Sequence, residues 1–382
     1  MSGIYIHIPF CKQACHYCDF HFSTSLKKKD EMVLALAKEI KMRKHEAANE
    51  FIETIYFGGG TPSILSVEDI QFLLDSVYQN YNVVTHPEIT VEANPDDLTE
   101  ERIIDLSKNK VNRLSIGIQS FYEDDLQLMN RAHNANEAQK CLQIATQYFN
   151  NISLDLIYGI PGSSNEKWKK NIEKALSFGV PHISSYALTV EPKTALEKFI
   201  KKGIINPPDD EVAQEQFYIL VNTLQSKGFV HYELSNFGKP NYFSKNNSAY
   251  WLGKKYIGIG PSAHSYDGKS RGWNIANNTL YIKSIEENKL PIETETLTNK
   301  DRYNEYVMTG LRTIWGVSLE RVEREFGTQY LEYLLQQAKR FLEDDFLEIV
   351  TPSVGDKILK TTPKGKFLCD GIASDLFLLH LK

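Results

Sequence analysis

Three cysteines close to the start of the chain have the spacing of ligands for an iron–sulfur cluster. Cys11, Cys15 and Cys18 follow one another as C-x3-C-x2-C, directly after a short run of residues typical of a strand. Thiolates gathered in one short loop suit the closely spaced iron corners of a cubane. Three ligands for four irons leave one iron open, and an open iron can bind a small molecule. The spacing therefore predicts a reactive cluster.

Two other interpretations of these cysteines stay open at this point. A structural zinc site needs a closed set of four ligands, and His16 or His21 would complete such a set. The spacing favours the cluster over zinc, and it favours a disulfide least. The other two cysteines, Cys141 and Cys369, stand alone in the sequence and are typical of small buried side chains.

The residues around the cysteines resemble the signature of the radical S-adenosylmethionine (SAM) superfamily. The stretch Tyr-x-His-Ile-Pro-Phe-Cys, which ends at Cys11, and an aromatic residue before Cys18 resemble the oxygen-independent coproporphyrinogen III oxidase family and its relatives, the HemW heme chaperones. The resemblance implies a [4Fe-4S] cluster whose open iron is chelated by the amino and carboxylate groups of SAM. One electron then splits the sulfonium to give a 5′-deoxyadenosyl radical, while the protein positions the partners and keeps water and oxygen away.

Short β-type runs alternate with helical patterns along the first half of the chain. The β-type runs are residues 4–8, 54–57, 88–93, 113–118, 152–158 and 182–188, and residues 31–40 and 69–78 have amphipathic helical patterns. Six strand-then-helix units favour parallel strands with right-handed crossovers. Periodicity alone does not separate an open sheet from a barrel. The family resemblance implies an α/β fold, a partial (β/α)6 barrel of the radical SAM type.

Unusual residues stand where several of these strands end, which is where barrels of this kind hold their chemistry. Glycines 58–60 would let the backbone approach a ligand, although a tight turn explains them equally well in isolation. Carboxylates at Glu92 and Asp155 would be costly to bury without a partner, and a salt bridge is the plainer explanation of Glu92. The resemblance assigns SAM contacts to Tyr5, Tyr17, Gly59, Gly60, Thr61, Glu92, Gln119, Arg131, Asp155 and Ala187.

The segment 244–251 resembles a heme-chaperone pattern that usually reads His-Asn-x-x-Tyr-Trp, whose histidine is the proposed heme contact. Here Asn246 replaces that histidine, whereas Asn247, Tyr250 and Trp251 keep the rest of the pattern. Asparagine is a poor iron ligand, so a heme bound to this chain needs another axial ligand.

His264 and His231 are the candidates for that ligand. Taken singly, each histidine is more often a hydrogen-bonded residue with no metal role. Tyr250 and Trp251 would stack on a porphyrin face, although two adjacent aromatic residues more often belong to a core.

The last part of the chain changes character and predicts a second domain. We expect residues 1–295 to form the barrel with its accessory strands, including one strand at 229–237, and residues 296–382 to form a helical, winged-helix-like domain that covers the barrel mouth. The elements predicted there are helices at 301–312, from Leu319 with Ser318 as N-cap, and at about 330–342, and strands at 347–350 and 358–361. The segment has charges of both signs and no basic recognition helix, which argues against binding DNA.

The composition of the chain indicates the class of protein and the compartment in which it works. The chain has 382 residues, of which 42% are hydrophobic and 24% charged, ordinary values for a globular protein. The net charge of -6 argues against a broad nucleic-acid surface. We find no signal peptide and no apolar run long enough to span a bilayer. Five cysteines, three of them clustered, do not suit a secreted disulfide framework, so we expect a reducing, cytoplasmic setting.

Two classes of function remain. The first is a chaperone that binds heme and delivers it to apoproteins; the second is an enzyme that decarboxylates two propionates of coproporphyrinogen III. In the enzyme family a further cysteine follows the motif after one residue, whereas here Asp19 and Phe20 follow Cys18. The absence of that further cysteine favours the chaperone, whereas Asn246 in place of the usual histidine counts against it.

The expected partners follow from this interpretation. They are heme or a porphyrinogen, an electron donor for the cluster and acceptor hemoproteins, with a transient membrane contact kept as a candidate and no nucleic acid. We assign no catalytic residue. The acceptor, the reductant and the oligomeric state stay open.

Overall fold

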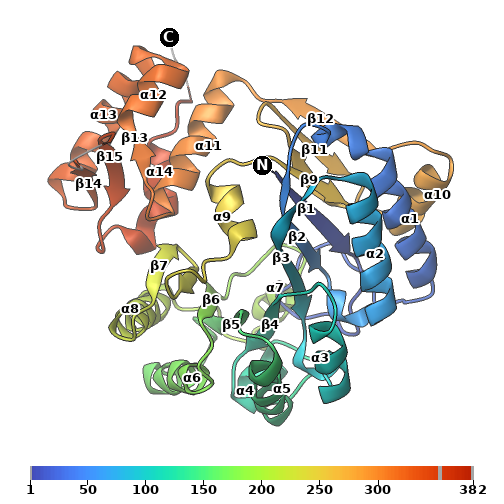
Figure 1. Cartoon of the computed structure of the whole chain (residues 1–382). Helices are drawn as coiled ribbons and strands as arrows, with labels where there is room; N and C mark the ends of the chain where they lie inside the picture. The colour runs from blue at the N-terminus through green and yellow to red at the C-terminus, as the bar shows by residue number, and fades with distance from the viewer. Residues whose placement is uncertain (1, 352–354, 380–382) are drawn as a thin grey trace.

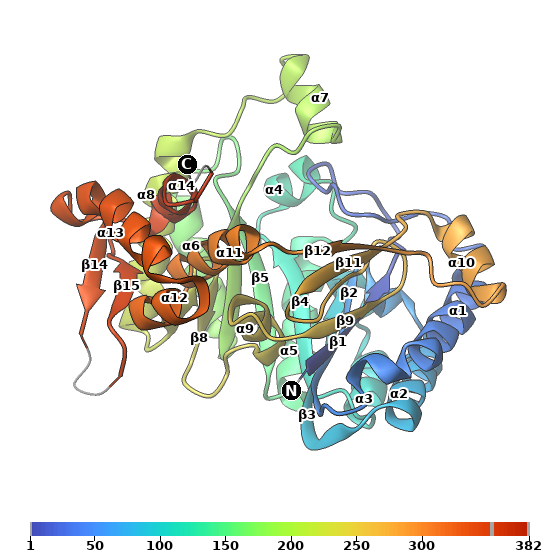
Figure 2. The same ribbon diagram turned by 90° about the horizontal axis from the view of Figure 1, so that it is seen from above.

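The computed structural model describes residues 2–351 and 355–379 and is built around one large curved sheet (Figures 1 and 2). Its central strands are β1 (Ser2–Ile8), β2 (Ile52–Gly59), β3 (Val83–Ala93), β4 (Arg113–Gln119), β5 (Ile152–Tyr158) and β6 (His182–Ala187). They lie side by side in chain order and pair in parallel. β1 and β6 do not pair with each other, so the barrel is open. The predicted partial (β/α)6 barrel is confirmed.

Helices cover the outer face of this sheet (Figure 1). These are α1 (Lys29–Met42), α2 (Val67–Asn80), α3 (Glu100–Ser107), α4 (Glu123–Leu128), α5 (Ala135–Tyr148), α6 (Asn165–Ser177) and α8 (Asp210–Ser226). The short helix α7 (Ala195–Lys201) stands away from the sheet (Figure 2), and Leu196 N–H donates to His16 O at 2.8 Å. The helical patterns at 31–40 and 69–78 are confirmed by α1 and α2. Local signals set the boundaries: α2 begins with a capping box between Ser66 and Asp69. Of the helices that the structure describes, none has the length and apolar character needed to cross a membrane.

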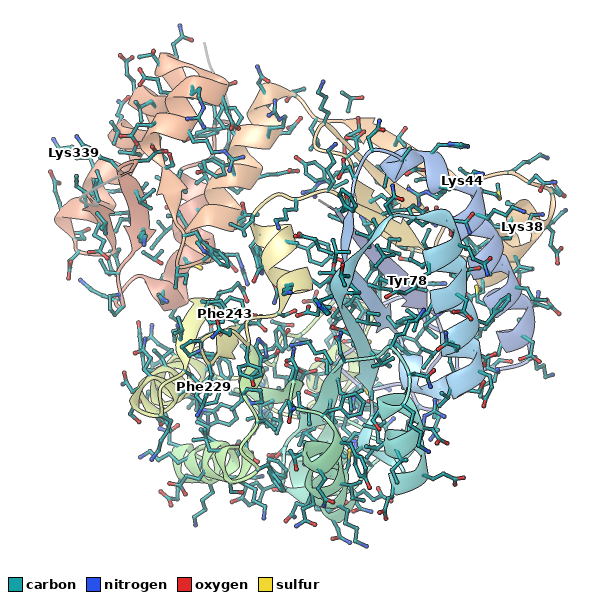
Figure 3. The ribbon with its side chains drawn as sticks, in the orientation of Figure 1. Lys38, Lys44, Tyr78, Phe229, Phe243 and Lys339 are labelled. Atoms are coloured by element: carbon teal, nitrogen blue, oxygen red, sulfur yellow. The ribbon has the colours of Figure 1, made fainter. Side chains whose placement is uncertain are left out.

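Shorter strands extend the sheet at both edges. Beyond β6 lie β8 (Asn236–Gly238) and β7 (Val230–Glu233), and beyond β1 lie β9 (Tyr256–Ile259), β10 (His264–Tyr266), β11 (Ser270–Asn274) and β12 (Ile292–Thr296). The single strand predicted at 229–237 is wrong, because this segment folds back as the β7–β8 hairpin. The Glu233 carboxylate accepts hydrogen bonds from Ser235 N–H and from the Asn236 amide, which closes the turn. Figure 3 shows Phe243 at this edge, where its ring stacks on Tyr232 with 4.4 Å between centroids.

The C-terminal part contains α11 (Asn299–Leu311), α12 (Leu319–Phe326), α13 (Thr328–Glu343) and a small antiparallel sheet of β13 (Val317–Ser318), β15 (Ile358–Thr361) and β14 (Leu347–Val350). The predicted helices and both predicted strands are present, and Arg321 N–H donates to Ser318 Oγ at 2.9 Å as the predicted N-cap requires. The sequence reasoning missed β13 and α14 (Cys369–Asp375). These elements have their own core, formed around Tyr303, Leu334 and Leu359.

The inner face of the barrel is polar, and this face carries the site. Side chains alternate along a strand, so the apolar residues of each strand pack against the helices and the others point inward. Thus Leu114 and Ile116 are fully buried under helices, whereas Arg113 and Ser115 line an interior cavity. The N-terminus of α9 (Lys245–Trp251) packs against the barrel wall, where the Glu88 carboxylate accepts the backbone N–H groups of its first two residues.

A buried polar cluster fixes α1 against the β9–β11 edge. Glu39 is fully buried and accepts hydrogen bonds from Asn274, from Tyr281 and from the N–H of Gly260, while Arg43 forms an ion pair with it at 3.3 Å. Tyr281 belongs to α10 (Asn278–Glu286). Burial raises the pKa of Glu39, which these partners oppose. The cluster holds the strands that extend the sheet beyond β1.

Candidate functional site

The three cysteines lie in the loop that leaves the carboxyl end of β1, and none is in a disulfide. Backbone hydrogen bonds shape the loop: Cys11 N–H donates to Ser23 O at 3.1 Å, and His16 N–H donates to Met129 O at 3.0 Å. The loop is therefore held by the segment that follows α4 as well as by its own end. It places all three thiols at the end of the barrel where the predicted SAM residues also lie.

Two hydrogen-bond donors already point at the sulfur atoms. Thr61 Oγ1 lies 3.4 Å from Cys11 Sγ, and Arg131 Nη1 lies 3.3 Å from Cys15 Sγ. Donors of this kind stabilise thiolates, which are the form that binds iron. The donor set and its surroundings therefore fit an iron–sulfur cluster bound by Cys11, Cys15 and Cys18.

A closed zinc site is not assembled in this loop. His16 Nδ1 pairs with Leu128 O at 2.8 Å, and His21 Nε2 pairs with the Asn278 side chain at 2.8 Å. Across the part of the chain that the structure describes, no three His, Cys, Asp or Glu side chains are placed to share a single metal ion. Ligands to separate iron corners of a cluster do not need to meet at one ion. The geometry thus favours a cluster over the zinc alternative.

The glycine-rich segment runs directly against the cysteine loop. Gly60 N–H donates to Ile8 O at 2.9 Å, and Thr61 N–H donates to Phe10 O at 2.7 Å. A Cβ atom on Gly60 would lie 2.6 Å from Phe10 O, and one on Gly59 would lie 2.5 Å from the His7 ring. Glycine is required here by close packing, and the same packing brings Thr61 to the sulfur of Cys11.

Arg131 and Gln119 meet beside the cysteine loop. Arg131 donates to Asn94 Oδ1 at 2.6 Å and to Gly117 O at 3.0 Å, and its Nη1 also lies 3.4 Å from the Tyr17 hydroxyl. Gln119 has a φ of 66°, in the left-handed region that few non-glycine residues adopt, after a register irregularity in β4. A Cβ atom on Gly117 would lie 2.8 Å from Gln119 Nε2 and 3.2 Å from Arg131 Nη2. Glycine at position 117 therefore makes room for both predicted side chains.

A cavity of about 220 Å³ opens inside the barrel and is lined by three of the predicted SAM residues, Tyr5, Glu92 and Asp155. The Tyr56 hydroxyl donates to Glu92 Oε1 at 2.7 Å, and Ser115 Oγ lies 3.4 Å from Asp155 Oδ1. Burial raises the pKa of Glu92 to about 7 and that of Asp155 to about 6. Two buried carboxylates that titrate near neutrality suit a cationic ligand.

Arg113 faces the same cavity and was missed by the sequence reasoning. Its side chain is 2% exposed, its Nε has no hydrogen-bond partner, and among the described residues no carboxylate lies within ion-pair distance. Its charge opposes the rise in the pKa values of Glu92 and Asp155. The sequence does contain a signal for Arg113: it is a charged residue at the start of an otherwise apolar strand, two positions before Ser115.

The remaining SAM candidate, Ala187, ends β6 next to Tyr158 of β5 and does not line the cavity. The predicted residues therefore form two neighbouring groups. Tyr17, Thr61, Gln119 and Arg131 lie with the cysteine loop and the glycine segment, and Tyr5, Glu92 and Asp155 lie in the barrel cavity.

The candidate heme ligands differ sharply in availability. Both ring nitrogens of the buried His231 are engaged, Nε2 with Leu234 O at 2.9 Å and Nδ1 with Lys366 Nζ at 3.2 Å, and its ring stacks on Phe237 at 4.2 Å. No ring nitrogen is left for iron, which counts against the expectation for His231. His264 lies exposed on β10.

The other residues of the heme-chaperone pattern lie on α9. Asn246 is 4% exposed and accepts a hydrogen bond from Thr54 Oγ1 at 3.2 Å, so this position belongs to the barrel interior. Tyr250 borders the barrel cavity and a second cavity, and Trp251 lines the second one. The guanidinium of Arg312 lies over the Trp251 ring, 4.9 Å from its centroid.

Comparison with known proteins agrees with this geometry. The family model "Radical SAM superfamily" matches residues 5–175, and "HemN C-terminal domain" matches residues 297–368. The heme chaperone HemW of Bacillus subtilis (strain 168) is 37% identical over 86% of this chain and 87% of its own. HemW of Mycobacterium tuberculosis (strain H37Rv) is 32% identical over 98% of this chain and 94% of its own.

Among solved structures, the coproporphyrinogen III oxidase HemN from Escherichia coli, described as a radical SAM enzyme, superimposes with a TM-score of 0.84. The match covers 99% of this chain and 90% of that one at 22% sequence identity, a level that supports the fold alone. The radical SAM fold that the family resemblance implied is thus confirmed.

Proposed function

The chain belongs to the radical SAM superfamily and, within it, to the family of the heme chaperone HemW, and we propose that it binds heme and delivers it to apoproteins. The observation that carries this proposal is the 37% identity to the Bacillus subtilis chaperone over 86% of the chain. The free thiols, with hydroxyl and guanidinium donors beside two of them, support retention of the cluster.

Different residues of the site would bind the cluster and SAM. Cys11, Cys15 and Cys18 would hold the cluster, and Thr61 and Arg131 would stabilise its sulfur ligands. Glu92 and Asp155 would attract the positive groups of SAM. When bound, the cluster and SAM supply one-electron chemistry, and the buried site keeps water away from it.

Further parts of the proposal concern the setting and the domains. Five free cysteines suit a reducing compartment such as the cytoplasm, where a reductant for the cluster is available. We also propose that the division near residue 295 separates the barrel from a domain that covers its mouth. The separate core around Tyr303 and Leu334 supports this division.

The function can be tested with cluster-reconstituted protein under anaerobic conditions. Heme is titrated while the Soret band is followed, and in parallel coproporphyrinogen III is incubated with SAM, reductant and protein and the products are separated by chromatography. We expect heme binding, transfer of heme to an apo-hemoprotein and no decarboxylation. Formation of protoporphyrinogen IX without heme binding would instead make the chain an oxidase and overturn the proposal.

A further inference from the structure

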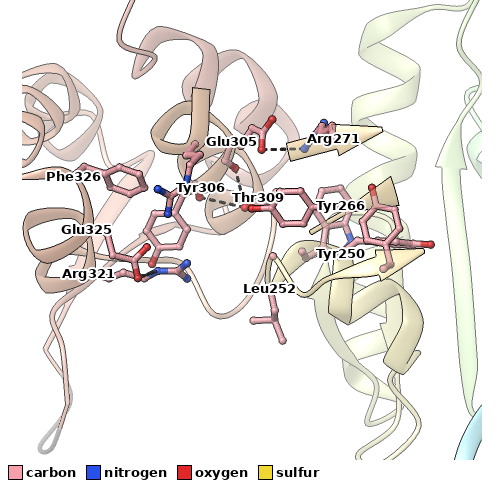
Figure 4. Close-up of a pocket in the computed structure, with 14 residues that line it drawn as sticks. Tyr250, Leu252, Tyr266, Arg271, Glu305, Tyr306, Thr309, Arg321, Glu325 and Phe326 are labelled. Atoms are coloured by element: carbon pink, nitrogen blue, oxygen red, sulfur yellow. Dashed lines mark hydrogen bonds and ion pairs between the residues drawn. The ribbon is translucent and has the colours of Figure 1, made fainter. Parts of the chain in front are cut away.

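A second cavity, of about 230 Å³, lies between the barrel and the C-terminal helices (Figure 4). Aromatic side chains form its walls: Tyr250 and Tyr266 come from α9 and β10, and Tyr306 and Phe326 come from α11 and α12. These segments are far apart in the sequence and meet only in the folded chain. Aromatic walls on opposite sides suit a flat aromatic ligand.

Arginines stand among these aromatic rings. Arg271 forms an ion pair with Glu305 at 3.0 Å, and Arg321 forms one with Glu325 at 3.0 Å. Arg302 lies over the Phe326 ring, 5.7 Å from its centroid, and no carboxylate of the described residues lies within ion-pair distance of it. An arginine without an acidic partner in a ligand-sized cavity is suited to bind a carboxylate of the ligand.

A histidine lies beside the cavity on the same sheet face. His264 and Tyr266 are two residues apart on β10 and so lie on one face, while Ser265 points to the other face and contacts Arg43. Across the antiparallel pairing, Tyr266 lies opposite Arg271 and His264 opposite Trp273. The rings of His264 and Trp273 are 6.3 Å apart. The aromatic surface of the cavity therefore continues to an exposed imidazole.

We propose that this cavity and the adjoining face of β10 and β11 form the heme site, with His264 as axial ligand to the iron and Arg302 as the partner of a propionate. This inference rests on the proposed function and names the place where the heme lies. It also explains how the chain binds heme with Asn246 in an interior position, because the iron ligand comes from another strand.

The size of the cavity bears on how heme would be held. Its volume of about 230 Å³ is below the ~300 Å³ at which pockets begin to enclose drug-sized ligands. Only one edge of the macrocycle fits between the aromatic walls, and the rest lies over His264 and Trp273 at the surface. A heme held by one edge is accessible to an acceptor protein, as delivery requires.

The site also adjoins the barrel cavity. Tyr250 lines both cavities, so a heme edge and a ligand near Glu92 would contact the same side chain. Burial raises the pKa of Tyr250, so its hydroxyl stays protonated. Binding at one site can therefore affect the other through the position of a single ring.

The test uses three tetrapyrrole probes on the full-length, cluster-reconstituted protein: heme, protoporphyrin IX, which lacks the iron, and heme with both propionates esterified. The variants are His264→Ala and Arg302→Gln. Their controls are His86→Ala, an exposed histidine of β3, and Lys300→Gln, which removes an exposed charge from the same helix as Arg302. Dissociation constants come from absorbance and fluorescence titrations.

We expect His264→Ala to weaken heme binding about tenfold or more, to shift the Soret band and to leave protoporphyrin IX binding unchanged. Arg302→Gln should weaken heme and protoporphyrin IX by about 10- to 100-fold, the range for a hydrogen bond to a charged group, and should not weaken the ester further. Both controls should bind like the wild type.

The outcomes separate this site from the proposed function. If the wild type binds heme and both test variants bind it equally well, the site is wrong and the chaperone function stands. If the wild type binds none of the probes, both the site and the proposed function fail.

Discussion

Replacing Glu92 by glutamine should make the ligand-free protein more stable at alkaline pH. Burial raises the pKa of Glu92 from 4.5 to about 7. Between these two values the folded chain binds more protons than the unfolded chain, so stability falls as pH rises through this window and the loss is complete above about pH 7. A difference of roughly 2.5 units corresponds to about 3 kcal/mol at ~1.4 kcal/mol per unit.

The measurement is the free energy of unfolding in urea at pH 5 and pH 8, for the wild type, Glu92→Gln and Glu101→Gln, an exposed control on α3. Glutamine can still accept the hydrogen bond from Tyr56. Between pH 5 and pH 8 the wild type and the control should each lose up to about 3 kcal/mol more than Glu92→Gln does. Equal pH dependence in all three proteins would refute the electrostatic reasoning.

Although Glu92→Gln should stabilise the ligand-free protein, it should weaken the binding of SAM. The ionised carboxylate attracts the sulfonium and ammonium groups, so wild-type affinity should rise as pH increases through about 7. Calorimetry on Glu92→Gln should give a weaker affinity with much less change across this range. A variant that binds SAM as tightly as the wild type at pH 8 would remove Glu92 from the site.

Three further predictions test the parts around this cavity. Cys15→Ser should abolish cluster assembly, and a full complement of iron and sulfide in the variant would exclude this ligand. Gly117→Ala should displace Gln119 and weaken SAM binding about tenfold while the cluster still assembles, as read by calorimetry and by iron content. Glu39→Ala leaves the buried Arg43 with Glu46 as its only ion-pair partner, so the free energy of unfolding in urea should fall by about 3 kcal/mol. An unchanged unfolding midpoint would show that the buried pair contributes nothing to stability.

Local signals explain how much of the fold the sequence predicts. Buried parallel strands are continuous apolar runs, so the six runs of the barrel stand out. Ser318 is recognisable as an N-cap because its role depends on residues three positions away. The cysteine loop is recognisable for the same reason, since its three ligands lie within eight residues of one another.

The parts that sequence reasoning missed depend on contacts between distant segments. Lys366, 135 residues away, engages His231, and no local pattern reveals this partner. The cavity between the barrel and the C-terminal helices requires α9, β10 and α12 to meet, so its lining cannot be read from any one segment. The β7–β8 hairpin was not predicted because Glu233 closes a turn inside a run that otherwise has strand character.

The polar interior of the barrel lowers the stability of the protein when no ligand is bound. Glu92 and Asp155 are buried carboxylates whose ionised forms are unfavourable, and Arg113 is a buried cation without a close partner. An apolar interior would stabilise the empty barrel better. A cationic ligand that binds only the folded state offsets part of this cost, so SAM should raise the melting temperature of the wild type more than that of Glu92→Gln.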